Sequence, residues 1–418
     1  MSGTTTAPAV PDRDTFVELD RHDPLAPLRD HFDLPTDLIY LDGNSLGALP
    51  AGTPAALDAV VRGQWRNDLN RGWTQHGWLR LPVTVGDAIG ALIGAAPGQV
   101  VVGESTSTNL FKLLWGALAQ RPGRRVVLSD TGNFPSDLYV ADGLVNLVSG
   151  GHELRVVPTD DVVAHLGPDV AVVLLSHVDY RTGEILPVQQ ITERAHEAGA
   201  LVLWDLCHSA GAMPVHVDEW GVDLAVGCGY KHLNGGPGAP AFMYVSHRLL
   251  PRFTQPVTGW IGHRDPFAFD PVYHRDPSPV GLLSGCPPVL GLVALEQGVR
   301  LLRRADLRQI RDKAVALTDR FVRLVAARPG NRRLGLLGPA EAQRRGSHVS
   351  YRHPAAEAVV AELLRRGVMV EYRPPDVVRF GFAPLYVRYA DVWDAAAALT
   401  EAVATVETAV NDGGLRHE

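Results

Sequence analysis

The chain has 418 residues, more than one typical domain, so we expect two domains. Hydrophobic residues make up 46% and charged residues 20%, which is typical of a globular protein with a large core. A formal net charge of −7 argues against a nucleic-acid-binding protein, and no apolar stretch is long enough to cross a membrane. Three cysteines without metal-ligand spacing indicate a reducing cytoplasm and no bound metal. We expect the basic clusters at 121–125 and 344–345 to be solvated loops.

The N-terminal segment is weakly patterned. Residues 1–11 have neither the basic start nor the apolar stretch of a signal peptide, and residues 1–35 are rich in proline, so we expect an arm. A glycine-punctuated turn follows at Tyr40–Gly47. Its small and polar residues, which include Asn44 and Ser45, suit a substrate entrance and suit a plain turn equally well.

Thr53 and Pro54 are expected to open a helix, with the Thr53 hydroxyl as N-cap and the proline in the first turn. Its apolar stripe comprises Leu57, Val60, Val61 and Trp65. Short apolar runs then alternate with helical periods, and strands are predicted at 100–102, 126–128, 170–175, 201–204, 224–226 and 241–245. Helices are expected between them, at 109–120 and at 188–198, where Gly199 closes the helix. This pattern predicts an α/β fold with a mostly parallel sheet covered by helices on both faces.

The pattern changes after about residue 300. Helices are expected at 307–327, 355–366 and 390–410, and strands at 348–352, 368–372 and 377–380. These elements predict a smaller α+β domain after the Gly- and Pro-rich segment 277–288. We therefore expect an arm (1–35), a large domain (36–295) and a small C-terminal domain (296–418).

Two residues at predicted strand ends carry the most informative chemistry. Asp205 follows one apolar strand, and Lys231 follows the next after Gly227-Cys228-Gly229, 26 residues further on. Ligands of parallel sheets bind at the carboxyl ends of the strands. A lysine that condenses with an aldehyde, and a carboxylate that keeps a pyridine nitrogen protonated, are what pyridoxal phosphate requires. A helix cap and a solvated lysine are the alternative, but the small residues around Lys231 favour a cofactor site.

Two further segments follow strands in the same half of the chain. Gly103–Asn109 offers hydroxyls and backbone amides at a helix N-terminus, which suits either a phosphate or simple N-capping. Asn133–Asp137 places Phe134 beside an acid, where the ring stacks on a pyridine or belongs to the core. Arg379 ends an apolar strand, where a guanidinium is costly unless it is paired. A substrate carboxylate and a structural ion pair are equally good partners for it.

Five segments together resemble the kynureninase family of fold type I (aminotransferase-like) pyridoxal-phosphate enzymes. They are GNSLG (43–47), NFPSD (133–137), WDLCHSAG (204–211), GYKHLNGGPG (229–238) and GWIGH (259–263). The resemblance runs from Tyr40 to about Tyr389. It implies a homodimer that uses pyridoxal phosphate to cleave the Cβ–Cγ bond of L-kynurenine hydrolytically, giving anthranilate and L-alanine in tryptophan breakdown.

The resemblance also implies roles for individual residues. Lys231 matches the Schiff-base lysine, Asp205 the partner of the pyridine nitrogen, and Tyr230 an acid/base that acts on the carbonyl. Thr106, Ser107, Tyr230 and Trp260 match positions that hold the phosphate, and other positions that match cofactor contacts are Phe134, Pro135, Ser136, Asp137, Ser176 and His208. Arg379, Asn44 and Ser45 match substrate-binding positions, and Trp73 matches one that lines the aryl pocket. Cys286 stands where the family usually has Thr or Asn, and a thiol is a weaker hydrogen-bonding partner than either.

Several alternatives share this fold. Neither Trp73 nor Cys286 suits a buried 3-hydroxyl, so we expect 3-hydroxykynurenine to be a secondary substrate rather than the preferred one. An aminotransferase is a second alternative. A cysteine desulfurase is a third, but it uses a mobile cysteine late in the chain, and no cysteine follows residue 300 in this sequence. A non-catalytic ligand-binding relative is disfavoured because both Lys231 and Asp205 are retained.

Overall fold

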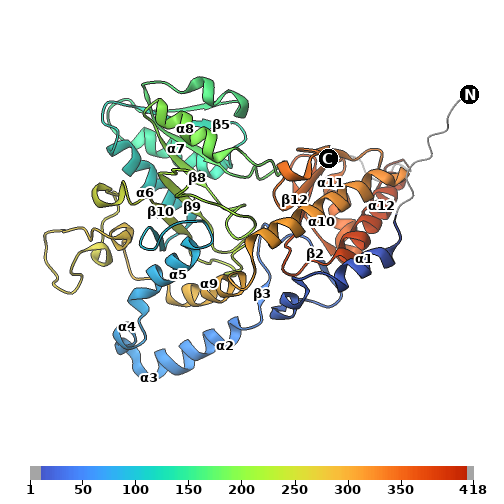
Figure 1. Ribbon diagram of the computed structural model, residues 1–418, viewed down its shortest axis with the longest axis horizontal. Helices are drawn as coiled ribbons and strands as arrows, with labels where there is room; N and C mark the ends of the chain where they lie inside the picture. Colours follow the sequence, from blue (N-terminus) through green and yellow to red (C-terminus); the bar gives the residue numbers. More distant parts are fainter. Residues whose placement is uncertain (1–10, 412–418) are drawn as a thin grey trace, which may run out of the picture. The chain divides into compact units, whose positions relative to one another are not determined.

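The computed structural model describes residues 11–411, which fall into two compact units (Figure 1). The large unit comprises Leu49–Tyr180 and Ile185–Leu307. The terminal unit comprises Met1–Ala48, Arg181–Glu184 and Arg308–Glu418. This division differs from the predicted boundaries, because the first 48 residues belong to the same unit as the C-terminal residues rather than forming a separate arm.

The large unit contains a seven-stranded sheet with strand order β4-β10-β9-β8-β7-β5-β6. The strands are β4 (Val100–Val102), β5 (Val126–Asp130), β6 (Glu153–Val157), β7 (Val170–Ser176), β8 (Leu201–Asp205), β9 (Leu224–Gly227) and β10 (Phe242–Val245). Only β10 runs antiparallel, to both β4 and β9, so the mostly parallel α/β sheet is confirmed. The edge strand β6 was not predicted, because four of its five residues are exposed or half-buried and no continuous apolar run marks it.

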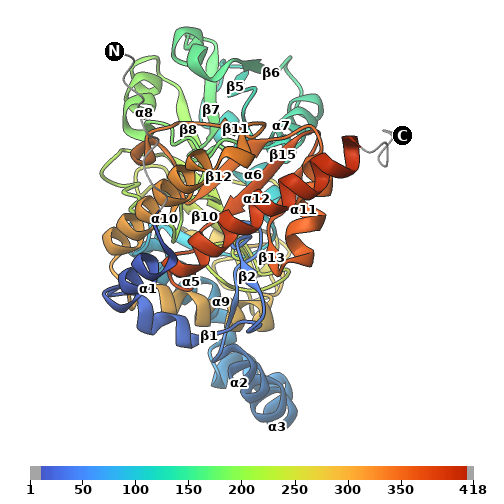
Figure 2. The ribbon, with the colours of Figure 1, turned by 90° about the vertical axis from the view of Figure 1, so that its right-hand side faces the viewer.

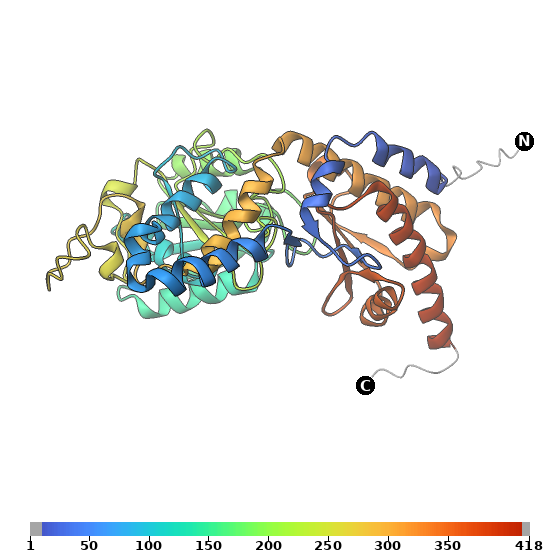
Figure 3. The ribbon, with the colours of Figure 1, turned by 90° about the horizontal axis from the view of Figure 1, so that it is seen from below.

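Helices cover both faces of this sheet. Leu203 on β8 packs in one core cluster with α6 (Thr106–Ala119) and α7 (Pro135–Leu147). Its neighbour Trp204 faces the other way, because side chains alternate along a strand, and its indole nitrogen donates to Thr192 on α8 (Val188–Glu197) at 3.2 Å. Further helices of the unit are α5 (Leu81–Gly90) and α9 (Val289–Leu302), and α9 lies beside α2 (Thr53–Asp58) in Figures 1 and 3.

The helix that begins at Thr53 differs from its prediction. Gly52 rather than Thr53 is the N-cap, and the helix continues through a π-helical segment, Ala59–Trp65, into α3 (Arg66–Asp68). Of its apolar stripe, Val60 is buried, whereas Val61 and Trp65 are 39% and 55% exposed. Half of the stripe is therefore unburied within this chain.

The terminal unit contains a four-stranded antiparallel sheet of order β11-β12-β15-β14 (Gly335–Leu337, His348–Arg352, Val377–Gly381 and Glu371–Arg373). A separate pair joins β13 (Val368–Met369) to β2 (Ile39–Tyr40). The predicted strand at 368–372 is thus two strands, and β11 was not predicted. The helices are α1 (Arg13–Arg21), α10 (Leu307–Ala327), α11 (Ala356–Arg365) and α12 (Tyr389–Asn411), and α11 and α12 lie side by side (Figure 2). None of the helices in residues 11–411 is long and apolar enough to cross a membrane.

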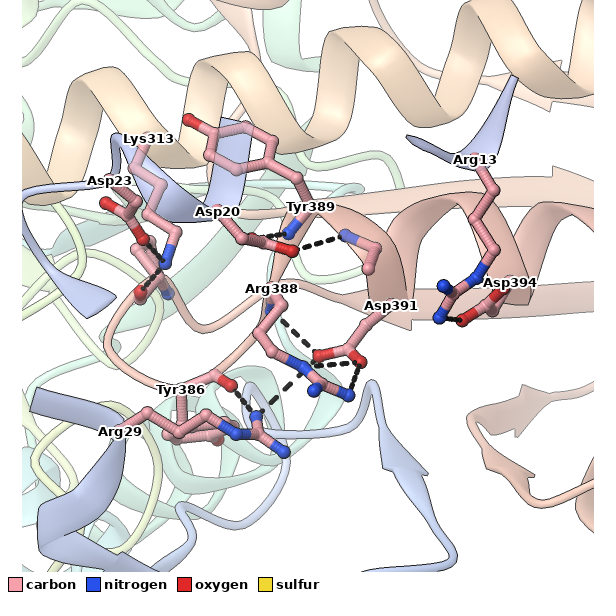
Figure 4. Close-up of polar contacts among 12 residues, drawn as sticks. Arg13, Asp20, Asp23, Arg29, Lys313, Tyr386, Arg388, Tyr389, Asp391 and Asp394 are labelled. Carbon is pink, nitrogen blue, oxygen red and sulfur yellow. Dashed lines mark hydrogen bonds and ion pairs between the residues drawn. The ribbon is translucent and has the colours of Figure 1, made fainter. Parts of the chain in front are cut away.

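Polar contacts fasten the N-terminal segment to this unit (Figure 4). The Asp20 carboxylate accepts from the backbone nitrogens of Tyr389 and Ala390 at 2.6 and 3.0 Å, and so caps the first turn of α12 from a distant part of the chain. Three ion pairs accompany this cap: Arg13–Asp394 at 2.7 Å, Lys313–Asp23 at 2.6 Å and Arg29–Asp391 at 3.7 Å. These contacts explain why the segment does not form a separate arm.

The basic cluster at 344–345 was predicted to be a solvated loop, but one of its two arginines is buried. The side chain of Arg345 is fully buried and donates to the carbonyl oxygens of Pro339 and Ala340 at 2.7 and 2.6 Å. In the other cluster Arg124 is half-buried and donates to the carbonyls of Val170 and Ala198, both at 2.8 Å. Both arginines satisfy backbone oxygens in their own unit.

Removing the buried lysine amine should destabilise the terminal unit. The side chains of Lys313 and Asp23 are only 5% and 3% exposed, and Lys313 also donates to the Pro384 carbonyl at 2.6 Å. Lys313→Met leaves the Asp23 carboxylate buried without its cation, which costs about 3–5 kcal/mol. Urea unfolding followed by circular dichroism measures this loss. The exposed pair supplies the control: Arg13→Met should cost less than about 1 kcal/mol, and equal losses in the two variants would contradict the expectation.

Candidate active site

Parallel pairing of β8 with β9 brings the two predicted residues to one edge of the sheet. Asp205 is the last residue of β8 and pairs in register with Val226 of β9. The chain leaves β9 at Gly227 and reaches Lys231 four residues later. The Lys231 amine lies 3.1 Å from Nε2 of His208, which follows Asp205 closely in the sequence. The structure thus groups Asp205, His208 and Lys231 at this edge of the sheet.

A second carboxyl group lies beside Asp205. Asp137, in the first turn of α7, is 3% exposed. Burial, together with the neighbouring Asp205 carboxylate and the hydrogen bond between the two, raises the pKa of Asp137 well above its usual range. The raised pKa of Asp137 favours a proton on this carboxyl, where it bridges to Asp205. Oδ2 of Asp137 is buried and has no hydrogen-bond partner within residues 11–411, so this pair has room for an N–H donor such as a protonated pyridine.

Aromatic rings lie next to the lysine. The Phe134 ring centroid is 5.8 Å from the Lys231 amine and that of Tyr230 is 6.0 Å away. The Phe134 turn is held by Asn133, whose Oδ1 accepts from the Phe134 backbone nitrogen and from the Ser176 hydroxyl, both at 2.8 Å. Ser176 therefore orders the turn that presents Phe134, and a flat face beside the amine suits a stacked cofactor ring.

Two helix N-termini meet nearby. α6 begins at Thr106, α7 begins at Pro135, and the hydroxyls of Ser107 and Ser136 are 3.2 Å apart. Free backbone N–H groups and the positive ends of the helix dipoles favour a phosphate at such a place. The residues at this edge of the sheet therefore fit pyridoxal phosphate: an amine, a carboxyl pair, an aromatic face and a phosphate seat.

Lys112 supports the phosphate seat and was not anticipated. Its side chain is fully buried on α6, pairs with Glu104 at 3.1 Å and donates to the Leu282 carbonyl at 3.2 Å. Glu104 has a φ of +57°, which is unusual for a residue other than glycine. The buried lysine thus holds a left-handed residue directly before Ser105, the N-cap of α6. The available signal was a lysine among the apolar residues Leu110, Leu113 and Leu114.

The phenol of Tyr230 is held in its protonated form. Burial, with a smaller contribution from neighbouring Cys228, raises the pKa of Tyr230 to about 12. Burial by itself would lower the pKa of the Lys231 amine, but it is outweighed and the pKa is raised by Cys228, Cys207, Tyr230 and Asp205. At neutral pH the site therefore presents the Tyr230 phenol as a proton donor, and a Lys231 amine that stays protonated until it condenses with an aldehyde.

Three predicted site residues of the large unit are not drawn into this group. Trp260 is 39% exposed and packs edge-on against Phe267, with ring centroids 5.8 Å apart. Cys286 is exposed. The hydrogen bonds and ring contacts of the described residues link neither of them to Lys231. Trp73 lines a cavity of about 570 Å³ together with Pro287 and Pro288, the residues that follow Cys286.

The remaining predicted residues belong to the terminal unit. Arg379, on β15, is fully buried and forms an ion pair with Glu371, and its Nη2 donates to the Ser45 hydroxyl at 2.7 Å. Asn44 is 1% exposed, and a Cβ at Gly381 would lie 1.8 Å from its Oδ1, so this approach requires glycine. The structure therefore brings Arg379 and Ser45 together, and Arg379 has the structural ion pair that was one of its two expected partners.

Several solved structures share the fold of this chain. A cysteine desulfurase from Thermococcus onnurineus NA1 superposes with a TM-score of 0.77 at 21% identity, over 91% of this chain and 98% of that one. The cystine C-S lyase C-DES superposes with a TM-score of 0.78 at 18% identity, over 88% and 98%. A C-DES mutant with glycine linked to its pyridoxal-phosphate cofactor gives a TM-score of 0.77 at 18% identity, over 94% and 99%. The fold is that of the fold type I pyridoxal-phosphate enzymes.

Sequence comparison identifies the family. A kynureninase from Pseudomonas fluorescens is 45% identical over 394 residues, 93% of this chain and 95% of that one. A kynureninase from Deinococcus radiodurans is 46% identical over 409 residues, 97% and 99% of the two chains. The family profile described as "Kynureninase C-terminal domain" matches residues 310–399. The chain belongs to the kynureninase family, and its cofactor is pyridoxal phosphate.

The cofactor should attach at Lys231. Borohydride treatment of the holoenzyme should leave the cofactor covalently on the peptide that contains Lys231, as peptide mass spectrometry will show. Lys231→Ala should bind no cofactor covalently and lose all turnover, because the chain then lacks the amine. The peptides that contain Lys112 and Lys313, whose buried amines pair with Glu104 and Asp23, are the internal control and should carry no cofactor. Labelling of any lysine other than Lys231 would contradict the assignment.

Asp42 should make stability depend on pH. Burial and the nearby Glu371 carboxylate raise the pKa of Asp42 to about 6. A carboxyl whose folded pKa is raised contributes stability at low pH and loses it as pH rises through about 6. The free energy of unfolding of Asp42→Asn, relative to that of the parent protein, should therefore be about 1 kcal/mol larger at pH 8 than at pH 5, because only the parent loses stability over this range. A difference that is independent of pH would show that Asp42 titrates normally.

Proposed function

We propose that the protein hydrolyses the Cβ–Cγ bond of L-kynurenine to give anthranilate and L-alanine. The grouping of Lys231, His208 and Asp205 with the Asp137 carboxyl, in a chain of the kynureninase family, carries this proposal. The reaction makes the protein a hydrolase of carbon–carbon bonds in ketonic substrates. Its place in metabolism is then tryptophan breakdown.

The residues divide the work around the cofactor. Pyridoxal phosphate, when bound, supplies a ring that takes up electrons from the substrate's α-carbon. Lys231 holds the cofactor and, once freed by the substrate, its amine takes the α-proton. The carboxyl pair of Asp205 and Asp137 keeps a proton on the ring nitrogen, and Phe134 covers one face of the ring. The helix N-termini at Thr106 and Pro135 hold the phosphate.

Tyr230 acts on the γ-carbonyl as a proton donor. With a pKa of about 12, its phenol stays protonated at neutral pH and cannot serve first as a base. The phenol therefore donates to the carbonyl oxygen while water adds to the carbon. The water releases its second proton to solvent, which leaves a hydrate and a phenolate. The phenolate then takes a hydroxyl proton from the hydrate as the carbon–carbon bond breaks, and the electrons of that bond pass to the alanine fragment. This order specifies the acid/base role that the resemblance implied.

Arg379 binds the α-carboxylate of the amino acid in this proposal. A guanidinium offers parallel N–H groups that match a carboxylate, and this guanidinium is buried, where the bond is strongest. Ser45, which accepts a bond from Arg379, and the neighbouring Asn44 complete the recognition of the substrate. The aryl group is bound by Trp73 and the segment around Cys286.

We also propose a cytoplasmic homodimer. Exposed apolar side chains gather around the 570 Å³ cavity of the large unit: Trp65, Leu69 and Leu290. The segment 257–272 adds Val257, Phe267, Phe269 and Val272, which are 42–79% exposed. Exposed apolar side chains in such number support contact with a second copy. The three cysteines are unpaired, which agrees with a reducing compartment.

Mixing the purified holoenzyme with L-kynurenine tests the reaction directly. Anthranilate fluorescence should appear together with one L-alanine for each anthranilate. The fold is shared with cysteine desulfurases, so L-cysteine is the matched control and should yield no sulfide. Sulfide release without anthranilate would favour the desulfurase alternative.

L-kynurenine should be used more efficiently than 3-hydroxykynurenine. A site built to bond a hydroxyl discriminates strongly, but the Trp73 indole and the Cys286 thiol offer that hydroxyl only weak partners. The ratio of kcat/KM for the two substrates measures the preference. A ratio that favours the hydroxylated substrate by about tenfold, or about 1.4 kcal/mol, would show that the aryl pocket holds a stronger polar partner.

A further inference from the structure

Arg379 lies directly opposite an acidic residue in its own sheet. β14 and β15 pair antiparallel with Glu371 in register with Arg379, so the two side chains project from neighbouring backbone positions. The Arg379 side chain is fully buried and that of Glu371 is 22% exposed. Nη2 of Arg379 donates to Oε2 of Glu371. The register of the sheet alone keeps this carboxylate within reach of the guanidinium.

Three donors hold the Glu371 carboxylate in place. Besides Arg379, the Ser45 hydroxyl donates to Oε2 at 2.7 Å, and Nη2 of Arg373 lies 2.7 Å from Oε1. The Ser45 oxygen in turn accepts from Nη2 of Arg379 at 2.7 Å, which closes a ring of three groups. Both oxygens of this carboxylate are bonded, by groups from β14, β15 and the Tyr40–Gly47 turn. A substrate anion is therefore not expected to displace it. It is a fixed part of the site.

The charges of this cluster sum to zero. Two guanidinium groups, Arg373 and Arg379, face two carboxylates, Glu371 and Asp42, and the flanking Tyr40 and Tyr386 carry uncharged phenols. If attraction alone governed binding, removing the Glu371 charge would strengthen the binding of an anion. If the direction of the guanidinium governs binding, the same change would weaken it. The two outcomes have opposite signs.

We propose that Glu371 is the positioning residue for Arg379: it fixes the guanidinium so that a substrate carboxylate binds in one orientation. This inference rests on the proposed role of Arg379 in binding an α-carboxylate. Glu371 does not touch the substrate and acts through Arg379 and Ser45. Fixing a guanidinium before binding saves the cost of ordering it at the moment of binding.

The test compares two ligands of the holoenzyme by equilibrium titration of the cofactor absorption. L-alanine carries an α-carboxylate, and ethylamine is the same molecule without it. The parent protein should bind L-alanine more tightly than ethylamine. Glu371→Gln should weaken L-alanine about tenfold, as expected for losing a charge-assisted bond, and leave ethylamine unchanged. Kynurenine turnover should show the same change as a rise in KM with kcat nearly unchanged.

Two further variants make the result specific. Glu362→Gln is the matched control, because Glu362 is also a buried carboxylate paired with arginines of the terminal unit, on α11. It should bind L-alanine like the parent protein. Glu371→Asp keeps the charge on a shorter side chain and should fall between the parent protein and Glu371→Gln. If Glu371→Gln fails to fold, L-alanine binding by Glu371→Asp still tests the positioning role.

Three results would contradict these proposals, and each can be told apart from the others. Tighter or unchanged binding of L-alanine by Glu371→Gln would overturn the positioning role. If the parent protein does not prefer L-alanine over ethylamine, Arg379 does not bind the α-carboxylate. The positioning role of Glu371 is then overturned as well. A failure of L-kynurenine turnover alone would overturn the proposed reaction but leave this binding comparison intact, because neither L-alanine nor ethylamine has to be cleaved.

Discussion

The parallel pairing of β8 with β9 is the constraint on which the site depends. It places the end of one buried strand, Asp205, beside the exit of the next, from which the chain reaches Lys231. Every residue of both strands is buried, so the register is specified by apolar packing on two faces. A slip of one residue would turn Asp205 to the opposite face of the sheet and separate it from Asp137. The position of Asp205 relative to Lys231 and Asp137 therefore depends on packing in the core of the large unit.

Three buried ionisable side chains near the proposed ligand contacts each have a partner outside their own helix or strand. The Asp137 carboxyl on α7 lies beside Asp205 on β8, Lys112 on α6 meets Glu104, and Arg379 on β15 meets Glu371 on β14. Such pairs add little net stability, because desolvation consumes most of the attraction. Their effect is geometric: each pair fixes the direction of one polar group next to a proposed ligand contact.

The sequence was sufficient to predict what local pattern determines. The continuous apolar strands of the large unit, the long helix at 307–327 and the positions of Asp205 and Lys231 at strand ends all follow from runs and periods of side chains. The edge strand β6 was not predicted because its residues are mostly polar or exposed. The apolar stripe of the helix after Thr53 was recognised, but a stripe does not reveal whether its own chain covers it.

The remaining differences come from side-chain partners that only the folded backbone brings together. Glu371 and Arg379 are only eight residues apart, yet nothing in Glu-Tyr-Arg marks the glutamate until the register of β14 with β15 is known. Lys112 pairs with Glu104 only because the backbone turns at a left-handed residue. The first 48 residues join the terminal unit through side chains that lie more than 250 residues away along the chain. Spacing in the sequence does not encode such partners.

The division of the chain into units also bears on the order in which it folds during synthesis. The large unit is almost one continuous stretch, Leu49–Leu307, whereas the terminal unit needs both ends of the chain. On the ribosome the large unit can form its sheet while residues after 307 are still being made. Until then Phe16, Leu25, Leu28 and Phe32, all buried in the finished protein, have no core to enter. The nascent chain therefore exposes these apolar side chains until the residues after 307 that cover them have been made.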